Sequence, residues 1–260
     1  MVEPLGSPVL LAACGVIAVL IGVMVWRLEV VAARPGGPIG RRLTGRSTAA
    51  EESRKWGAAV EGARLVASSK YLSGIVATVF LYELVSQVLD YQYSTTARAL
   101  LSGTAELQAF FGQVGSIVGV ISVVVQFFLV SLVIRKLGMT WALLILPGAM
   151  MAASGGYLAA PLLATAALLS ISDNALAYSI NQTARETLYM PRSPDVKYKA
   201  RAFANMFVQR CGKGVAILAA LALYMVPVRF LSVLAMLVSL LWMLVAGYLG
   251  RRFERETAVG

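Results

Sequence analysis

The stretch AFANMFVQRCGKGVAILAALALYMV, residues 202–226, carries Arg210 and Lys213 among apolar side chains. A transmembrane helix needs about 20 predominantly apolar residues, so this stretch is long enough to cross a bilayer. A charged side chain at membrane depth is costly and usually serves a function. The stretch therefore predicts a membrane helix with a polar site inside it.

The rest of the chain has the same apolar character. Of its 260 residues, 58% are hydrophobic and 14% are charged, which leaves too little polar surface for a soluble domain of this size. Seven windows have few or no charges and lie near residues 8–26, 71–90, 107–134, 139–159, 161–180, 202–226 and 230–248. We therefore predict an all-α polytopic membrane protein with seven transmembrane helices.

The windows divide the chain into four predicted parts. Residues 1–27 form a single transmembrane helix, which is too long for the core of a signal peptide and is expected to be retained. Residues 28–70 form a basic cytoplasmic linker whose Trp56, Val60, Ala63 and Ala67 recur at helical spacing and predict an amphipathic helix. Residues 71–250 form a six-helix transmembrane bundle. Residues 251–260 form a cytoplasmic tail.

The distribution of Lys and Arg predicts the orientation in the membrane. Nineteen of these residues lie in the segments 27–70, 135–136, 185–201 and 251–255, while the alternate connections hold only Arg98 and Arg229. Basic connections stay on the cytoplasmic side, so we expect the N-terminus outside and the C-terminus inside a cell inner (plasma) membrane. The net charge of +10 follows from this topology, and no nucleic-acid partner is expected.

The residue types exclude several kinds of chemistry. The chain has no His, so zinc-protease motifs and Ser-His-Asp triads are excluded. Cys14 and Cys211 both fall inside predicted spans, which argues against a disulfide framework or a thiolate metal site. No Gly-rich phosphate loop follows a strand pattern. We therefore predict that the protein is not an enzyme and holds no cofactor.

Polar side chains inside the spans form a candidate substrate-binding set. Glu83, Gln87 and Asp90 are spaced i, i+4, i+7 and share one helical face. At 1.5 Å per residue, Glu83 lies roughly 18 Å from the start of its span near Tyr71, close to the middle of a ~30 Å core. Arg210 and Lys213, spaced i, i+3, are neighbours on their helix. The candidate set consists of Lys213, Arg210, Asp90, Glu83, Gln87 and Asp173.

Two interpretations of this set compete. In the first, Glu83 or Asp173 neutralises Lys213 or Arg210 inside a dry bundle and fixes the helix register. In the second, the cations and carboxylates face a water-filled cavity, where an anionic solute replaces the internal partner during transport. We favour the cavity because charged groups on three spans exceed what one ion pair explains.

Two further patterns concern packing. Gly112, Gly115 and Gly119 place small residues along one stripe of their span, and such a stripe lets another helix approach closely. Pro147-Gly148 predicts a bend, because proline removes a backbone hydrogen bond and crowds the preceding turn.

The segment SINQTARETLYMPRSPDVKYKARAFANMFVQRCGKG, residues 179–214, resembles the nucleotide translocase (ATP:ADP antiporter) family of the major facilitator superfamily. The resemblance extends to LDYQYS at 89–94, AFFGQ at 109–113, RKLG at 135–138 and ILPGAM at 145–150. It covers roughly residues 65–250.

This resemblance implies twelve helices in two six-helix halves, with the substrate site between the halves. The chain then corresponds to the sixth helix, the central loop and the C-terminal half. Either the chain is a fragment or a second transporter half supplies the rest. The implied activity is ATP:ADP antiport, or transport of another nucleotide-like anionic solute.

The resemblance also implies roles for individual residues. Asp90 matches an acidic position of the family, and Arg210-Cys211-Gly212-Lys213 matches an Arg-x-Gly-Lys pattern of nucleotide-translocating members. Ser94 stands where a Lys is usual, and Ala204-Asn205 replace a common Ile-Asp pair. These departures leave the solute open, so the alternatives are a carrier of a different organic anion and a non-transporting membrane scaffold or interaction module.

Overall fold

A computed structural model of the chain describes residues 60–191, 193–222 and 225–258. The predicted first transmembrane helix and most of the predicted linker lie outside the described residues. The described end of the linker is helical over 60–68, and Glu61 there forms an ion pair with Lys199 at 2.7 Å.

The described residues are helical and contain no strand, which confirms the all-α prediction. The α-helices are α4 (Lys70–Leu100), α5 (Thr104–Val124), α6 (Val130–Ala159), α7 (Leu163–Leu176), α8 (Gln182–Leu188), α9 (Pro194–Phe203), α10 (Gln209–Ala222) and α11 (Leu231–Ala258). The π-helical turns η1 (Val125–Leu129), η2 (Ala177–Asn181) and η3 (Ala204–Val208) join α5 to α6, α7 to α8 and α9 to α10. A short 3-10 helix, η4 (Val228–Phe230), precedes α11.

Five stretches of the described chain are long and apolar enough to cross a membrane: Lys70–Leu100, Thr104–Phe128, Leu132–Ala159, Leu163–Leu188 and Val228–Thr257. They correspond to five of the seven predicted windows. The window 202–226 is helical as far as Ala222 but is not among the five, because Asn205, Gln209, Arg210 and Lys213 make it more polar. The window 8–26 lies outside the described residues. The helical membrane fold is therefore confirmed, and the count of seven spans stays a prediction.

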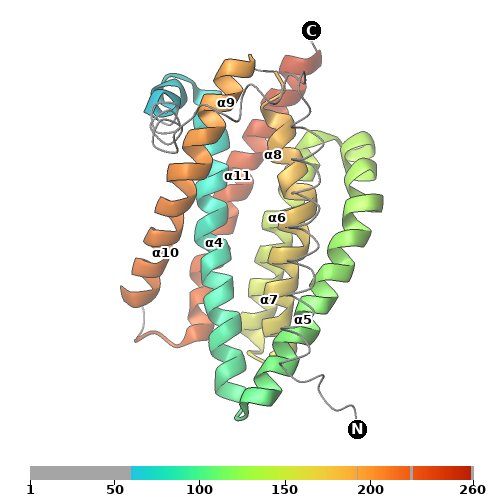
Figure 1. The fold of residues 1–260 in the computed structure, drawn as a ribbon, viewed down its shortest axis with the longest axis vertical. Helices are drawn as coiled ribbons and strands as arrows, with labels where there is room; N and C mark the ends of the chain where they lie inside the picture. Colours follow the sequence, from blue (N-terminus) through green and yellow to red (C-terminus); the bar gives the residue numbers. More distant parts are fainter. Residues whose placement is uncertain (1–59, 192, 223–224, 259–260) are drawn as a thin grey trace, which may run out of the picture. The chain divides into compact units, whose positions relative to one another are not determined.

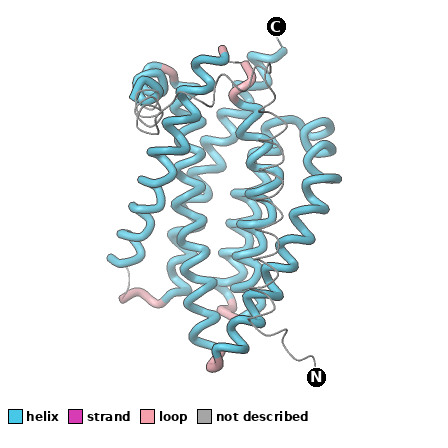
Figure 2. The backbone as a smooth tube through the Cα atoms, viewed as in Figure 1, coloured by secondary structure: helices cyan, strands magenta, loops and turns pink. Residues whose placement is uncertain are grey.

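The helices pack in two layers (Figure 1). In one layer α4 and α7 pack on each other, with α10 against the far side of α4 and α5 against α7. Behind them α11 packs on both α6 and α4, and α6 packs on α7. Figure 2 shows that the loops lie at the two ends of these helices. Helix α4 thus has neighbours on several sides, and its Tyr71, Ile75 and Leu89 are fully buried.

Two glycines let pairs of helices approach closely. A Cβ atom at Gly212 of α10 would lie 2.9 Å from the Cβ of Glu83 on α4, and one at Gly250 of α11 would lie 2.5 Å from the Cα of Thr140 on α6. Any larger residue would push the helices apart, since real Cβ atoms do not approach other heavy atoms so closely. Gly212 therefore fixes the distance between α10 and α4 beside the candidate site residues.

The helix labelled α6 contains a chain reversal at Gly138, whose φ of 83° and ψ of 175° favour glycine. This reversal separates the predicted windows 107–134 and 139–159. Helical dihedral angles continue through Pro147. Beside the stripe of Gly112, Gly115 and Gly119, no atom of the described residues lies within 4 Å of an added Cβ, so the predicted close helix packing is not found there.

Candidate functional site

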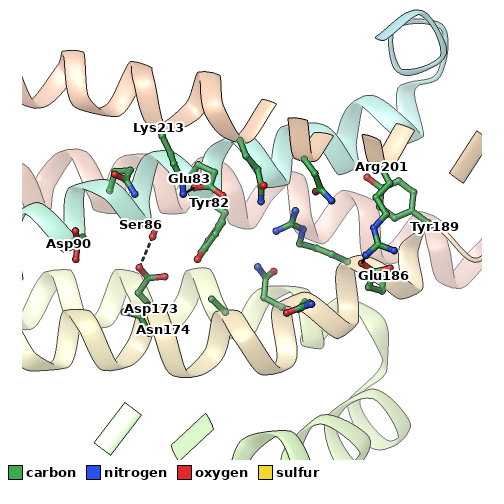
Figure 3. A pocket seen from close by; sticks show the side chains of 17 residues that line it. Tyr82, Glu83, Ser86, Asp90, Asp173, Asn174, Glu186, Tyr189, Arg201 and Lys213 are labelled. Atoms are coloured by element: carbon green, nitrogen blue, oxygen red, sulfur yellow. Dashed lines mark hydrogen bonds and ion pairs between the residues drawn. The ribbon is translucent and has the colours of Figure 1, made fainter. Parts of the chain in front are cut away.

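A polar cavity of about 510 Å³ opens between α4, the α7–α8 segment and the α9–α10 segment (Figure 3). The helices α5, α6 and α11 contribute nothing to its lining. Its lining residues are Tyr82, Glu83, Ser86, Gln87, Asp90, Asp173, Asn174, Ala177, Asn181, Gln182, Arg185, Glu186, Tyr189, Arg201, Asn205, Gln209 and Lys213.

The central feature of the cavity is an ion pair between α10 and α4. Lys213 Nζ lies 3.8 Å from Glu83 Oε2. The Glu83 side chain is only 6% exposed, whereas that of Lys213 is 54% exposed. The ammonium group carries three donors, so at this distance from a single carboxylate oxygen it keeps capacity for a second anion.

Opposite this pair, α7 presents a buried carboxylate. Ser86 Oγ donates a 2.6 Å hydrogen bond to Asp173 Oδ2, which links α4 to α7 (Figure 3). The other oxygen, Asp173 Oδ1, is buried and has no hydrogen-bond partner in the described part of the chain. A buried acceptor without a donor is costly, so this oxygen is ready to accept a hydrogen bond from water or a solute.

A second group of charges lies toward the other end of the cavity, where Figure 3 shows Arg201, Tyr189 and Glu186 together. Arg201 Nη2 and Glu186 Oε1 form an ion pair at 2.7 Å. Burial raises the pKa of the Tyr189 hydroxyl to about 12, so this group stays protonated and can donate at neutral pH.

Arg185 differs from the other cations of the cavity. It is partly buried, and no residue within 60–191, 193–222 and 225–258 holds it by a hydrogen bond or an ion pair. Glu83 and Glu186 attract it through space but do not contact it, and a partly buried guanidinium that lacks a direct partner is a costly arrangement that an anion relieves. Arg185 is therefore the cation of the cavity best placed to receive an added anion.

Five of the six predicted residues line this one cavity: Lys213, Glu83, Gln87, Asp90 and Asp173. Arg210 does not line it and is exposed, contrary to the predicted pairing of the two cations. The residues of this segment that face the cavity are Asn205, Gln209 and Lys213, spaced i, i+4, i+8. Since successive residues of an α-helix are rotated by about 100°, Arg210 points away from the side chain of Gln209.

The sequence did not predict two cations of the lining, Arg185 and Arg201, or its uncharged amides. The prediction places Arg185 and Arg201 in a basic connection, although Arg185 lies on α8, which continues α7 through η2. The amides Asn181, Asn205 and Gln209 carry no charge and are not in the predicted set. The helical spacing of Asn181 with Arg185, and of Asn205 with Gln209 and Lys213, was the available signal.

Comparison with known proteins gives the family. The family model described as TLC ATP/ADP transporter matches residues 10–172. ADP,ATP carrier protein 2 of Chlamydia pneumoniae is 24% identical over 217 residues, which cover 73% of this chain and 40% of that protein. The chain thus spans less than half the length of this relative. No solved structure matches. Because the family model covers more than half of the sequence, the chain belongs to the TLC ATP/ADP transporter family.

Proposed function

We propose that this chain forms one half of a secondary transporter that moves an anionic, nucleotide-like solute by alternating access. The observation that carries the proposal is the half-exposed Lys213, which lines an open polar cavity while its partner Glu83 is buried. A dry structural ion pair would bury both groups. A pair that borders a cavity lets a phosphate replace the carboxylate.

The cations are suited to a chain of phosphates. Lys213, Arg185 and Arg201 line the same cavity, and Figure 3 shows Lys213 and Arg201 at different positions along it. Guanidinium groups bind phosphate oxygens through two parallel donors, and Lys binds them as a point charge. We infer that phosphates contact Arg185 and Lys213, while Asp173 Oδ1 accepts a hydrogen bond from a hydroxyl or amino group of the solute.

Glu83 gives the empty site a resting partner. When no solute is present, its carboxylate neutralises Lys213 and limits the cost of a charge at membrane depth. When a phosphate enters, it competes with Glu83 for the same ammonium group. Binding and release then exchange one partner for another, and Lys213 never stands unpaired.

A second six-helix half completes the site in this proposal, either on the same polypeptide or on a partner chain. The two halves rock against each other around the cavity, in a plasma membrane with the basic ends of the helices in the cytoplasm. The lining offers binding groups but no paired nucleophile and base, which supports transport without chemical change of the solute.

The test compares two neighbouring cations on α10. The complete transporter is reconstituted in vesicles preloaded with ADP, and uptake of labelled ATP is measured for Lys213→Gln and for Arg210→Gln. Both variants lose one positive charge, but only Lys213 lines the cavity. We expect uptake to fall at least about tenfold for Lys213→Gln, since a charge-assisted hydrogen bond is lost, and to change little for Arg210→Gln.

Equal losses in the two variants would reject the assignment of the site. Full activity of Lys213→Gln would reject it as well. Competition by unlabelled organic anions in the same assay identifies a carrier of a different solute. If the folded wild-type protein takes up no anion at all, the result favours the alternative of a non-transporting membrane scaffold.

A further inference from the structure

A second hollow, of about 750 Å³, lies between α6 and α11. These helices form the layer behind α4 and α7 and line no part of the first cavity (Figure 1). Its walls include the apolar Leu144, Leu240 and Leu244, together with the three arginines Arg251, Arg252 and Arg255. The hollow therefore has two chemically distinct ends, one lined by apolar side chains and one by cations.

The two ends form a continuous stripe along α11. Leu240, Leu244, Gly247, Arg251 and Arg255 recur every three or four residues and therefore share one face. The leucines are 50% and 66% exposed, although they lie in a membrane-spanning stretch. From Leu240 to Arg251 the helix rises by roughly 16 Å, about half of the ~30 Å hydrocarbon core. The stripe thus has the length of one leaflet.

Two of the three arginines have no partner among the described residues. Arg252 Nε lies 3.2 Å from Glu256 Oε1, and Arg252 Nη1 donates to the Tyr248 hydroxyl at 3.0 Å. Arg251 and Arg255 are exposed and make no hydrogen bond or ion pair with any residue that the structure describes. Like charges four residues apart on a helix repel, so one anion bound between Arg251 and Arg255 would reduce this repulsion.

Gly247 leaves the hollow open halfway along the stripe. An added Cβ at this position would meet no atom within 4 Å, so the space beside the helix there is empty. A large side chain at this position would start in this open space and extend into the hollow. The site therefore offers a variant that blocks it by volume alone.

We infer that this hollow binds one anionic phospholipid from the leaflet at the basic end of the bundle. Its phosphate lies between Arg251 and Arg255, and an acyl chain lies over Leu244 and Leu240. Basic pockets between membrane helices are suited to such headgroups, since each Lys or Arg near the surface adds attraction for anionic lipid. The inference does not depend on the proposed transport.

The test uses the purified full chain in detergent and two lipids with identical acyl chains, dioleoyl phosphatidylglycerol and dioleoyl phosphatidylcholine. Binding is measured by native mass spectrometry and by the shift in melting temperature. We expect phosphatidylglycerol to bind more tightly than phosphatidylcholine. The double variant Arg251→Gln/Arg255→Gln should weaken phosphatidylglycerol binding by about thirtyfold, since two attractive contacts are lost.

The matched control is Arg135→Gln/Lys136→Gln, which removes two exposed positive charges outside the hollow, in another of the basic connections. This control should retain the affinity, and Gly247→Trp should lose it while keeping the melting temperature of the lipid-free protein. Equal weakening in the two double variants would overturn the inference in favour of diffuse attraction. Equal binding of both lipids, or complete competition by inorganic phosphate, would also overturn it.

Discussion

Replacing Glu83 by Gln should strengthen nucleotide binding, because the resting partner of Lys213 loses its charge. The distance between Lys213 Nζ and Glu83 Oε2 is 3.8 Å. At this separation two unit charges attract by about 1 kcal/mol in water and about 4 kcal/mol at an effective dielectric constant of 20. Lys213 is 54% exposed, so solvent screening favours the lower figure. About 1 kcal/mol corresponds to roughly fivefold tighter binding.

The assay is a calorimetric titration of the purified complete transporter with ADP and ATP at low salt. Glu106→Gln is the matched control, because Glu106 is exposed in the first turn of α5 and does not line the cavity. In the Lys213→Gln background, the further change Glu83→Gln should no longer tighten nucleotide binding, since its effect acts only through the Lys213 ammonium group. Unchanged or weaker binding by a folded Glu83→Gln protein would refute the competition between carboxylate and phosphate.

Two further predictions concern the cavity and its packing. Arg185→Gln should weaken nucleotide binding about tenfold in the same titration, because a charged hydrogen-bond donor is lost. If Arg185→Gln and Arg210→Gln bind the nucleotide equally well, Arg185 does not contact it. Gly212→Val should destabilise the protein by about 1–3 kcal/mol through overpacking, since an added Cβ lies 2.9 Å from that of Glu83. Thermal melting should show this loss for Gly212→Val but not for Gly214→Val, because Gly214 has no neighbour within 4 Å.

Much of the fold could be predicted because long, apolar and almost uncharged stretches of sequence form membrane-spanning helices. The reversal between the windows 107–134 and 139–159 lies at Gly138, next to the basic connection predicted at 135–136. On α4, regular α-helical geometry over Lys70–Leu100 places Glu83, Gln87 and Asp90 on one face, so their spacing was sufficient. The family was also recognisable from short motifs and is confirmed by the family model.

The other wall of the cavity could not be predicted in the same way. Which face of α10 turns toward α4 depends on the close contact at Gly212, and this contact exists only after folding. The charge distribution places Arg185 in a connection between helices, because a count of charges cannot show that a helix continues past its apolar part. The unpartnered Asp173 Oδ1 depends on the position of Ser86, 87 residues away in sequence.

The π-helical turns η2 and η3 make the cavity sensitive to chain length as well as to residue identity. Each turn supplies one asparagine to the lining, Asn181 or Asn205, and each precedes a helix that supplies a cation. A π-helical turn holds one residue more than an α-helical turn. Deleting a single residue from η3 would rotate everything before it by about 100° relative to Lys213 and carry Asn205 to another side. Insertions and deletions at these two turns should thus redirect the solute preference of a transporter whose charged residues are all unchanged.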